Sequence, residues 1–188
     1  PWNQNTKLLH IGIKGYDLPP TEQKPANLVF LLDVSGSMDE PDKLPLLKSS
    51  FRLLVNKLKP TDTVSIVTYA GNAGIVLEPT KVSESAKILN DIDTLQPGGS
   101  TAGEAGINAA YAPAQKAFVK DGVNRIMLAT DGDFNVGAAS DEDLKKLVED
   151  KRKSGVFLSV LGFGQGNYQD NMMQTLAQNG NGIAAYID

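Results

Sequence analysis

Two aspartates in this 188-residue sequence stand at the ends of predicted buried strands. Asp33 follows the apolar run 28–32, and Asp131 follows the strand expected over residues 124–130. Continuous apolar runs are typical of strands covered on both faces of a parallel sheet, and the carboxyl ends of such strands border the ligand crevice where strand order reverses. If the two strands are neighbours, we expect the two carboxylates to converge there.

Hydroxyl side chains stand on loops beside these aspartates. Ser35 and Ser37 lie on the glycine-containing loop after Asp33, and Thr101 ends a second glycine-containing loop just before a predicted helix. Hydroxyl and carboxylate oxygens suit a hard divalent cation, with Mg²⁺ as the first choice and Mn²⁺ or Ca²⁺ as alternatives. The sequence therefore predicts one metal site, with the candidate ligands Asp33, Ser35, Ser37, Thr101 and Asp131.

This ligand set also predicts how the site is used. If the three hydroxyls bind the cation directly and the carboxylates hold its waters, the cation keeps most of its positive charge and one exchangeable position. A carboxylate from outside the chain is a good ligand for that position. We therefore expect a partner protein that supplies the side chain of an Asp or a Glu.

Apolar runs and helical patterns alternate along the chain, which predicts an α/β fold around a mostly parallel sheet. Residues 63–69 and 74–77 are joined by a short turn, so we expect this pair to be antiparallel and to form one edge of the sheet. The first helix is expected to have Asp42 as its cap. The expected strands are 28–32, 63–69, 74–77, 124–130, 156–161 and 183–187, and the expected helices begin near residues 42, 83, 102, 140 and 168.

The pattern Asp33-x-Ser35-x-Ser37, followed by Thr101 and Asp131, resembles the metal-ion-dependent adhesion site of von Willebrand factor type A domains. The resemblance covers roughly residues 26–188 and is nearest to bacterial extracytoplasmic members of the YfbK type. It implies a Rossmann-like, doubly wound, mostly parallel six-stranded sheet with one antiparallel edge strand and helices on both faces. It also implies a protein-binding role in adhesion or scaffolding, located in the periplasm or cell envelope.

The chain divides into two expected regions. Residues 1–25 comprise an extra strand near residues 7–15 and a proline-rich linker, and residues 26–188 form the von Willebrand A-type domain. Because the sequence begins at Pro1 and Trp2, without an initiator Met, we expect it to be a piece of a longer protein.

Other interpretations of the candidate ligands stay open. Asp33, Ser35 and Ser37 alone are also compatible with an ordinary strand-to-helix turn, because Asp and Ser stabilise turns. Ser100 is an alternative to Thr101 as a hydroxyl ligand.

Residues 131–142 also resemble the Ca²⁺-binding loop of an EF-hand, with oxygen-bearing side chains that include Asp133, Asn135 and Glu142. The sixth position of that loop, which needs glycine, is Val136, and a strand rather than a helix is expected before it. We therefore interpret Asp133 and Asn135 as loop residues at the rim of the main site.

The composition excludes several kinds of site and ligand. Cysteine is absent, the one histidine, His10, is distant in sequence from the polar clusters, and neither a nucleophile elbow nor a phosphate-binding loop is present. Acidic residues outnumber basic ones by 22 to 18, which argues against nucleic acid, and no apolar run is long enough to span a membrane. We therefore expect a binding module rather than an enzyme. A metal-dependent hydrolase and an intracellular chelatase-like partner of an ATPase are the alternatives.

Overall fold

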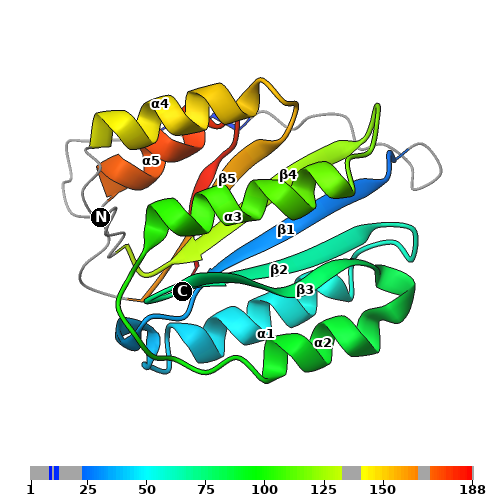
Figure 1. The fold of residues 1–188 in the computed structure, drawn as a ribbon, viewed down its shortest axis with the longest axis horizontal. Helices are drawn as coiled ribbons and strands as arrows, with labels where there is room; N and C mark the ends of the chain where they lie inside the picture. Colours follow the sequence, from blue (N-terminus) through cyan, green and yellow to red (C-terminus); the bar gives the residue numbers. More distant parts are fainter. Residues whose placement is uncertain (1–8, 10, 13–22, 133–140, 165–169, 188) are drawn as a thin grey trace.

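The computed structural model describes residues 9, 11–12, 23–132, 141–164 and 170–187. Within them, one twisted sheet of six strands has helices packed on both faces (Figure 1). The strands follow the order β3-β2-β1-β4-β5-β6 across the sheet. Their bounds are β1 Ala26–Asp33, β2 Thr63–Tyr69, β3 Ala73–Lys81, β4 Val123–Thr130, β5 Phe157–Phe163 and β6 Ala184–Ile187.

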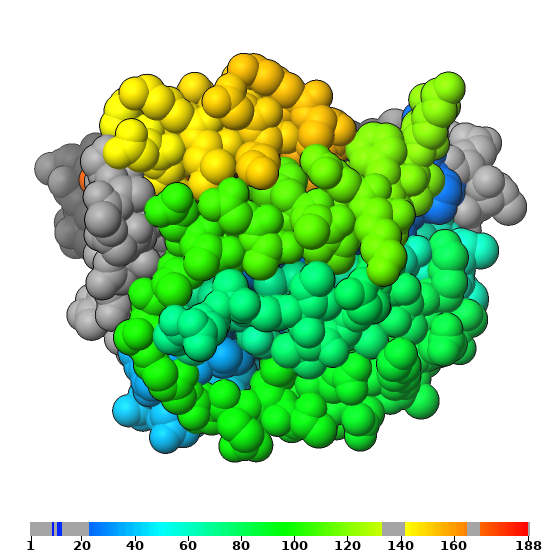
Figure 2. All heavy atoms as spheres, viewed as in Figure 1, coloured from blue at the N-terminus to red at the C-terminus, as the bar shows by residue number. Residues whose placement is uncertain are grey.

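All neighbouring strands run parallel except β2 and β3, which form an antiparallel hairpin at one edge. This arrangement confirms the predicted fold class. Strand β1 lies between β2 and β4, so the chain order reverses at β1 and the carboxyl ends of β1 and β4 lie side by side. Figure 2 shows the outer edge of the hairpin at the surface between two helices, α3 and α2.

The helices form one layer on each face of the sheet. Their bounds are α1 Leu44–Val55, α2 Ser85–Asp93, α3 Gly103–Lys116, α4 Asp141–Arg152 and α5 Asp170–Asn179. Helices α1 and α2 cover one face, and α3, α4 and α5 cover the other (Figure 1). Short 3₁₀ helices at Gly36–Met38 and Val82–Glu84 precede α1 and α2.

Strand β1 supplies both cores because its side chains alternate between the two faces. Val29 and Leu31 pack toward α3–α5, whereas Phe30 and Leu32 pack toward α1 and α2. The ring of Phe30 meets the ring of Phe51 edge to face, with centroids 4.3 Å apart. These four residues in the middle of β1 are inaccessible to solvent, which explains the unbroken apolar run in the sequence.

The predicted cap of α1 is wrong. Lys43, not Asp42, occupies the N-cap position, and no side chain caps the helix. Pro45 in the first turn has no N–H to be capped, which lessens the need for a capping side chain. Helix α3, expected from the sequence to run from about Ala102 to Tyr111, continues through Pro113 to Lys116.

Some expected elements fall partly outside the described residues. Of the extra strand expected over residues 7–15, only Leu9, Ile11 and Gly12 are described, and these three are not in a strand. The expected start of α4 at Ser140, the expected start of α5 at Tyr168, and His10 lie outside the described residues. Within the described segments, no helix is long and apolar enough to cross a membrane.

Candidate metal centre

Asp33 lies at the carboxyl end of β1 and is inaccessible to solvent. Its Oδ1 accepts a hydrogen bond of 2.9 Å from the backbone N–H of Ser35. Its Oδ2 accepts hydrogen bonds of 3.2 Å from the hydroxyls of Tyr69 and Thr130. Both oxygens are therefore held in place, by the loop after β1 and by the last residues of the adjacent strands β2 and β4.

The loop after Asp33 turns sharply into a 3₁₀ helix at Gly36–Met38. The hydroxyls of Ser35 and Ser37 lie 3.0 Å apart and share a hydrogen bond. Ser35 is buried and Ser37 is exposed, so the pair extends from the end of the sheet to the surface.

The loop that carries Thr101 packs against this serine loop. The N–H of Gly36 donates to the carbonyl of Gly99 at 3.0 Å, and the N–H of Gly98 donates to the carbonyl of Val34 at 2.8 Å. Gly99 has a φ of 84°, which favours glycine. Thr101 follows this paired segment by two residues and is half-buried.

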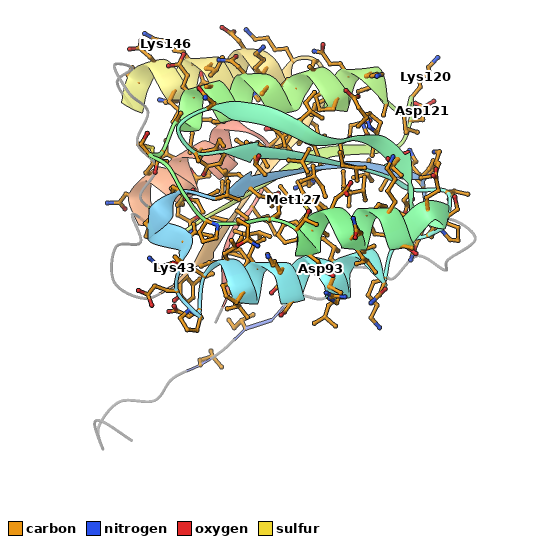
Figure 3. The ribbon with its side chains drawn as sticks, turned by 60° about the horizontal axis from the view of Figure 1, so that its bottom comes forward. Lys43, Asp93, Lys120, Asp121, Met127 and Lys146 are labelled. Atoms are coloured by element: carbon orange, nitrogen blue, oxygen red, sulfur yellow. The ribbon has the colours of Figure 1, made fainter. Side chains whose placement is uncertain are left out.

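Asp131 follows β4 and is nearly buried, with 4% of its surface exposed. Its Oδ2 accepts a hydrogen bond of 2.9 Å from the Nζ of Lys43. The same ammonium donates to the backbone carbonyl of Ser37 at 2.8 Å. Figure 3 shows Lys43 at the start of α1, beside the end of the sheet where β1 and β4 finish.

Electrostatics oppose the charged form of Asp33. Burial raises the pKa of the Asp33 carboxyl, its hydrogen bonds from Ser35 lower it, and the negative charge of Asp131 raises it. The two carboxylates are thus close enough to repel each other. Burial also raises the pKa of the Tyr69 hydroxyl well above its usual value, with the charge of Asp33 acting in the same direction, so this hydroxyl stays protonated as a donor.

These residues fit a hard divalent cation. Two repelling, buried carboxylates lie beside paired serine hydroxyls, and every donor is oxygen, which is the ligand chemistry of Mg²⁺, Mn²⁺ and Ca²⁺. In the described part of the chain, no three His, Cys, Asp or Glu residues form a metal-binding cluster. A cation at this edge of the sheet would therefore depend on hydroxyl ligands as well as carboxylates.

The structure brings the loops of all five candidate residues to one end of the sheet, whereas Asp133 and Asn135 lie outside the described residues. Sequence reasoning missed Lys43, Tyr69 and Thr130. A signal for Lys43 exists, because a positive charge at a helix N-terminus opposes the helix dipole and needs a nearby acid to stabilise it. Tyr69 and Thr130 end β2 and β4, as Asp33 ends β1, so their position was also readable from the strand pattern.

Comparison with known proteins identifies a family for this chain. Residues 27–188 match the family described as von Willebrand factor type A domain. An uncharacterized protein of Escherichia coli K12, YfbK, is 47% identical over 188 residues, which is 100% of this chain and 33% of YfbK. The chain thus spans about a third of the length of this curated relative.

Solved structures share the fold at lower identity. Manganese-loaded TRAP protein from Plasmodium vivax has a TM-score of 0.69 and 19% identity, with 88% of this chain and 69% of that chain covered. Proximal thread matrix protein 1 from the mussel byssus, with zinc in its adhesion motif, has a TM-score of 0.68 and 23% identity, with 87% of this chain and 42% of that chain covered. Both overlays support the doubly wound sheet described above.

Proposed function

Because the chain belongs to the von Willebrand factor type A domain family, we propose that it is a protein-binding module whose contact with its partner depends on a divalent cation. The observation that carries the proposal is the convergence of the buried carboxylates of Asp33 and Asp131 with the serine pair at one end of the sheet. The proposed ligands are Asp33, Ser35, Ser37, Thr101 and Asp131, with Mg²⁺ as the proposed ion.

Two of the similar solved structures contain a divalent metal, which supports a divalent cation in this chain. One is loaded with manganese and the other has zinc in its adhesion motif. When bound, the cation would supply positive charge and a position at which an acidic side chain of the partner is a suitable ligand. The residues of this chain would hold the ion, and the loops around it would select the partner.

The residue types available favour binding over hydrolysis. The sequence has no cysteine and no nucleophile elbow, and its one histidine, His10, is far in sequence from the candidate ligands. Hydrogen bonds hold both carboxylate oxygens of Asp33 in a fixed orientation, which suits a residue that positions an ion. We therefore propose an adhesion or scaffold role rather than a catalytic one.

A hollow of about 250 Å³ beside the serine loop offers room for further partner contacts. The lining of this hollow includes one acidic residue, Asp39, and one basic residue, Lys48. Most of the remaining lining residues are apolar: Leu44, Pro45, Leu95 and Pro97. One carboxylate on a hydrated ion provides little specificity, so contacts of this kind would have to distinguish the true partner.

The first test is metal binding itself. Calorimetric titration with Mg²⁺ and with Mn²⁺ should show one site per chain, lost in Asp33→Asn. Asp121→Asn is the matched control, because Asp121 lies at the opposite end of the sheet (Figure 3) and its φ of 62° suits asparagine. Absence of binding of either ion to the unmodified protein would refute the proposal.

The second test concerns the partner. A pull-down from the cell envelope should recover a protein whose retention is lost with chelator and with Asp131→Ala. Metal-dependent turnover of a simple ester or phosphate, without a chelator-sensitive partner, would support the hydrolase instead. The envelope location stays a prediction, and recovery of the partner from that fraction would support it.

A further inference from the structure

Lys43 reaches the centre of the proposed site from outside its ligand set. Its Nζ donates to Oδ2 of Asp131 at 2.9 Å and to the carbonyl of Ser37 at 2.8 Å. The side chain of Asp131 in this ion pair is 2% exposed and that of Lys43 is 15% exposed. The pair is therefore largely shielded from water, unlike the exposed ion pairs of this chain, such as Lys116 with Glu78.

The path of the Lys43 side chain is shaped by its surroundings. Gly164, at the end of β5, has a φ of 78°, and a Cβ there would lie 2.7 Å from both Cγ and Cε of Lys43. A side chain at Gly164 would therefore displace the aliphatic stem of Lys43 from its present path, and the positive φ also favours glycine. The carbonyl of Gly164 in turn accepts a hydrogen bond of 2.6 Å from the hydroxyl of Tyr186 in β6. Residues of β5 and β6 thus border the route by which the ammonium reaches Asp131.

The carboxylate of Asp131 cannot bind the Lys43 ammonium and a divalent ion at the same time without weakening both interactions. An ammonium within hydrogen-bond distance of Asp131 neutralises the charge that a divalent ion would use, and two positive charges on one carboxylate repel each other. A lysine ammonium is a compact point charge on a flexible stem, so it can leave without a change in the fold.

We propose that Lys43 is a built-in competitor of the divalent cation: it holds Asp131 in the metal-free protein and leaves that carboxylate when the ion binds. This inference rests on the proposed metal site. It assigns Lys43 two effects, which are to balance the charge of the buried acids without metal and to lower the affinity for the ion. The apparent dissociation constant of the site would then be higher than it would be without Lys43, so half-filling would need more divalent cation.

The test compares three variants by calorimetry with Mg²⁺. Lys43→Met keeps the length of the stem and removes the charge, so its affinity should be about tenfold higher than that of the unmodified protein, the gain expected when one partly buried ion pair no longer competes. Lys43→Arg keeps the charge and should bind no more tightly than the unmodified protein. Lys116→Met, in α3, removes an exposed ammonium that pairs with Glu78 away from the site and should leave the affinity unchanged.

A second measurement detects the displacement directly in the unmodified protein. The ammonium of Lys43, shielded in its ion pair, should give a nitrogen-15 NMR signal that is assigned by its loss in Lys43→Arg. Saturation with Mg²⁺ should shift or remove this signal and leave the other lysine signals in place. This readout does not require Lys43→Met to fold.

The outcomes separate this inference from the proposed function. An affinity of Lys43→Met equal to or below that of the unmodified protein, or a Lys43 signal unmoved at saturation, overturns the inference alone. An unmodified protein that binds no divalent cation overturns both. Tighter binding by Lys43→Met together with a displaced signal supports the competitor role.

Discussion

Gly106 of α3 lies directly against the ring of Tyr69 in β2: a Cβ at Gly106 would be 2.9 Å from both Cγ and Cδ1 of that ring. The hydroxyl of the same tyrosine donates to Oδ2 of Asp33. Helix α3 therefore sets the position of a ring that orients a candidate metal ligand. The close approach is possible because glycine has no side chain.

Gly106→Ala should destabilise the fold by about 1–2 kcal/mol, because overpacking a buried ring costs more than the helix gains by replacing glycine. Displacement of the ring should also weaken metal binding, through the Tyr69 hydrogen bond to Asp33. Denaturant unfolding and calorimetry measure the two effects. Gly103→Ala, in the first turn of α3, is the comparison within the same helix. Unchanged stability and affinity in Gly106→Ala would contradict the argument.

Thr101→Ala should weaken metal binding by about tenfold or more while the protein keeps one cooperative unfolding transition. The reason is that Thr101 lies on a loop and contributes little to either core. Phe30→Ala is the contrasting variant: it removes a fully buried ring packed on Phe51 and should cost about 3–5 kcal/mol. Loss of folding in Thr101→Ala would show that the residue is structural.

The strands of the sheet could be predicted from the sequence because burial on both faces leaves an unbroken apolar run. Strand β2 has the expected bounds, Thr63–Tyr69, and β1 and β4 differ from expectation by one or two residues at their starts or ends. The convergence of Asp33 and Asp131 followed from strand adjacency alone.

The contacts between loops could not be predicted in the same way. Lys43 and Asp131 are 88 positions apart, and their ion pair depends on how α1 approaches the end of β4. The prediction of Asp42 as the cap of α1 was wrong for a related reason. Local propensity favours Asp42, but the helix starts one residue later, and Lys43 at its N-cap makes a tertiary contact with Asp131. Local preference was outweighed by packing.

Divalent cation should raise the stability of the folded protein. A ligand that binds only the native state adds about 2.7 kcal/mol at a concentration a hundredfold above its dissociation constant. Thermal unfolding should therefore shift upward with Mg²⁺ and return with chelator, and Asp33→Asn should remove the shift. If calorimetry shows that the protein binds Mg²⁺ but the thermal unfolding midpoint does not change with Mg²⁺, the unfolded chain binds the ion equally well.

Tyr111 in α3 gives a prediction that does not involve the metal. Its hydroxyl is buried and has no hydrogen-bond partner among the described residues, and the centre of its ring lies 5.4 Å from the Nζ of Lys151. An unsatisfied buried hydroxyl costs about 1–3 kcal/mol, so Tyr111→Phe should be as stable as the unmodified protein at neutral pH, or more stable by about 1 kcal/mol. Equilibrium unfolding in denaturant measures the difference. A clear loss of stability would mean that the hydroxyl has a partner, such as a buried water.

The same hydroxyl should make stability depend on alkaline pH. Burial raises the pKa of Tyr111 to about 12 from 10.0, so the folded protein keeps a proton that the unfolded chain releases. Below pH 10 the hydroxyl is protonated in both states, and its ionisation does not reduce the free energy of unfolding. As the pH rises from 10 toward 12, only the unfolded chain releases the proton, and the free energy of unfolding therefore falls. Unfolding free energies measured from pH 9 to 12 should therefore fall less steeply in Tyr111→Phe than in the unmodified protein. Equal slopes in Tyr111→Phe and the unmodified protein would show that Tyr111 ionises in the folded state as easily as in the unfolded one.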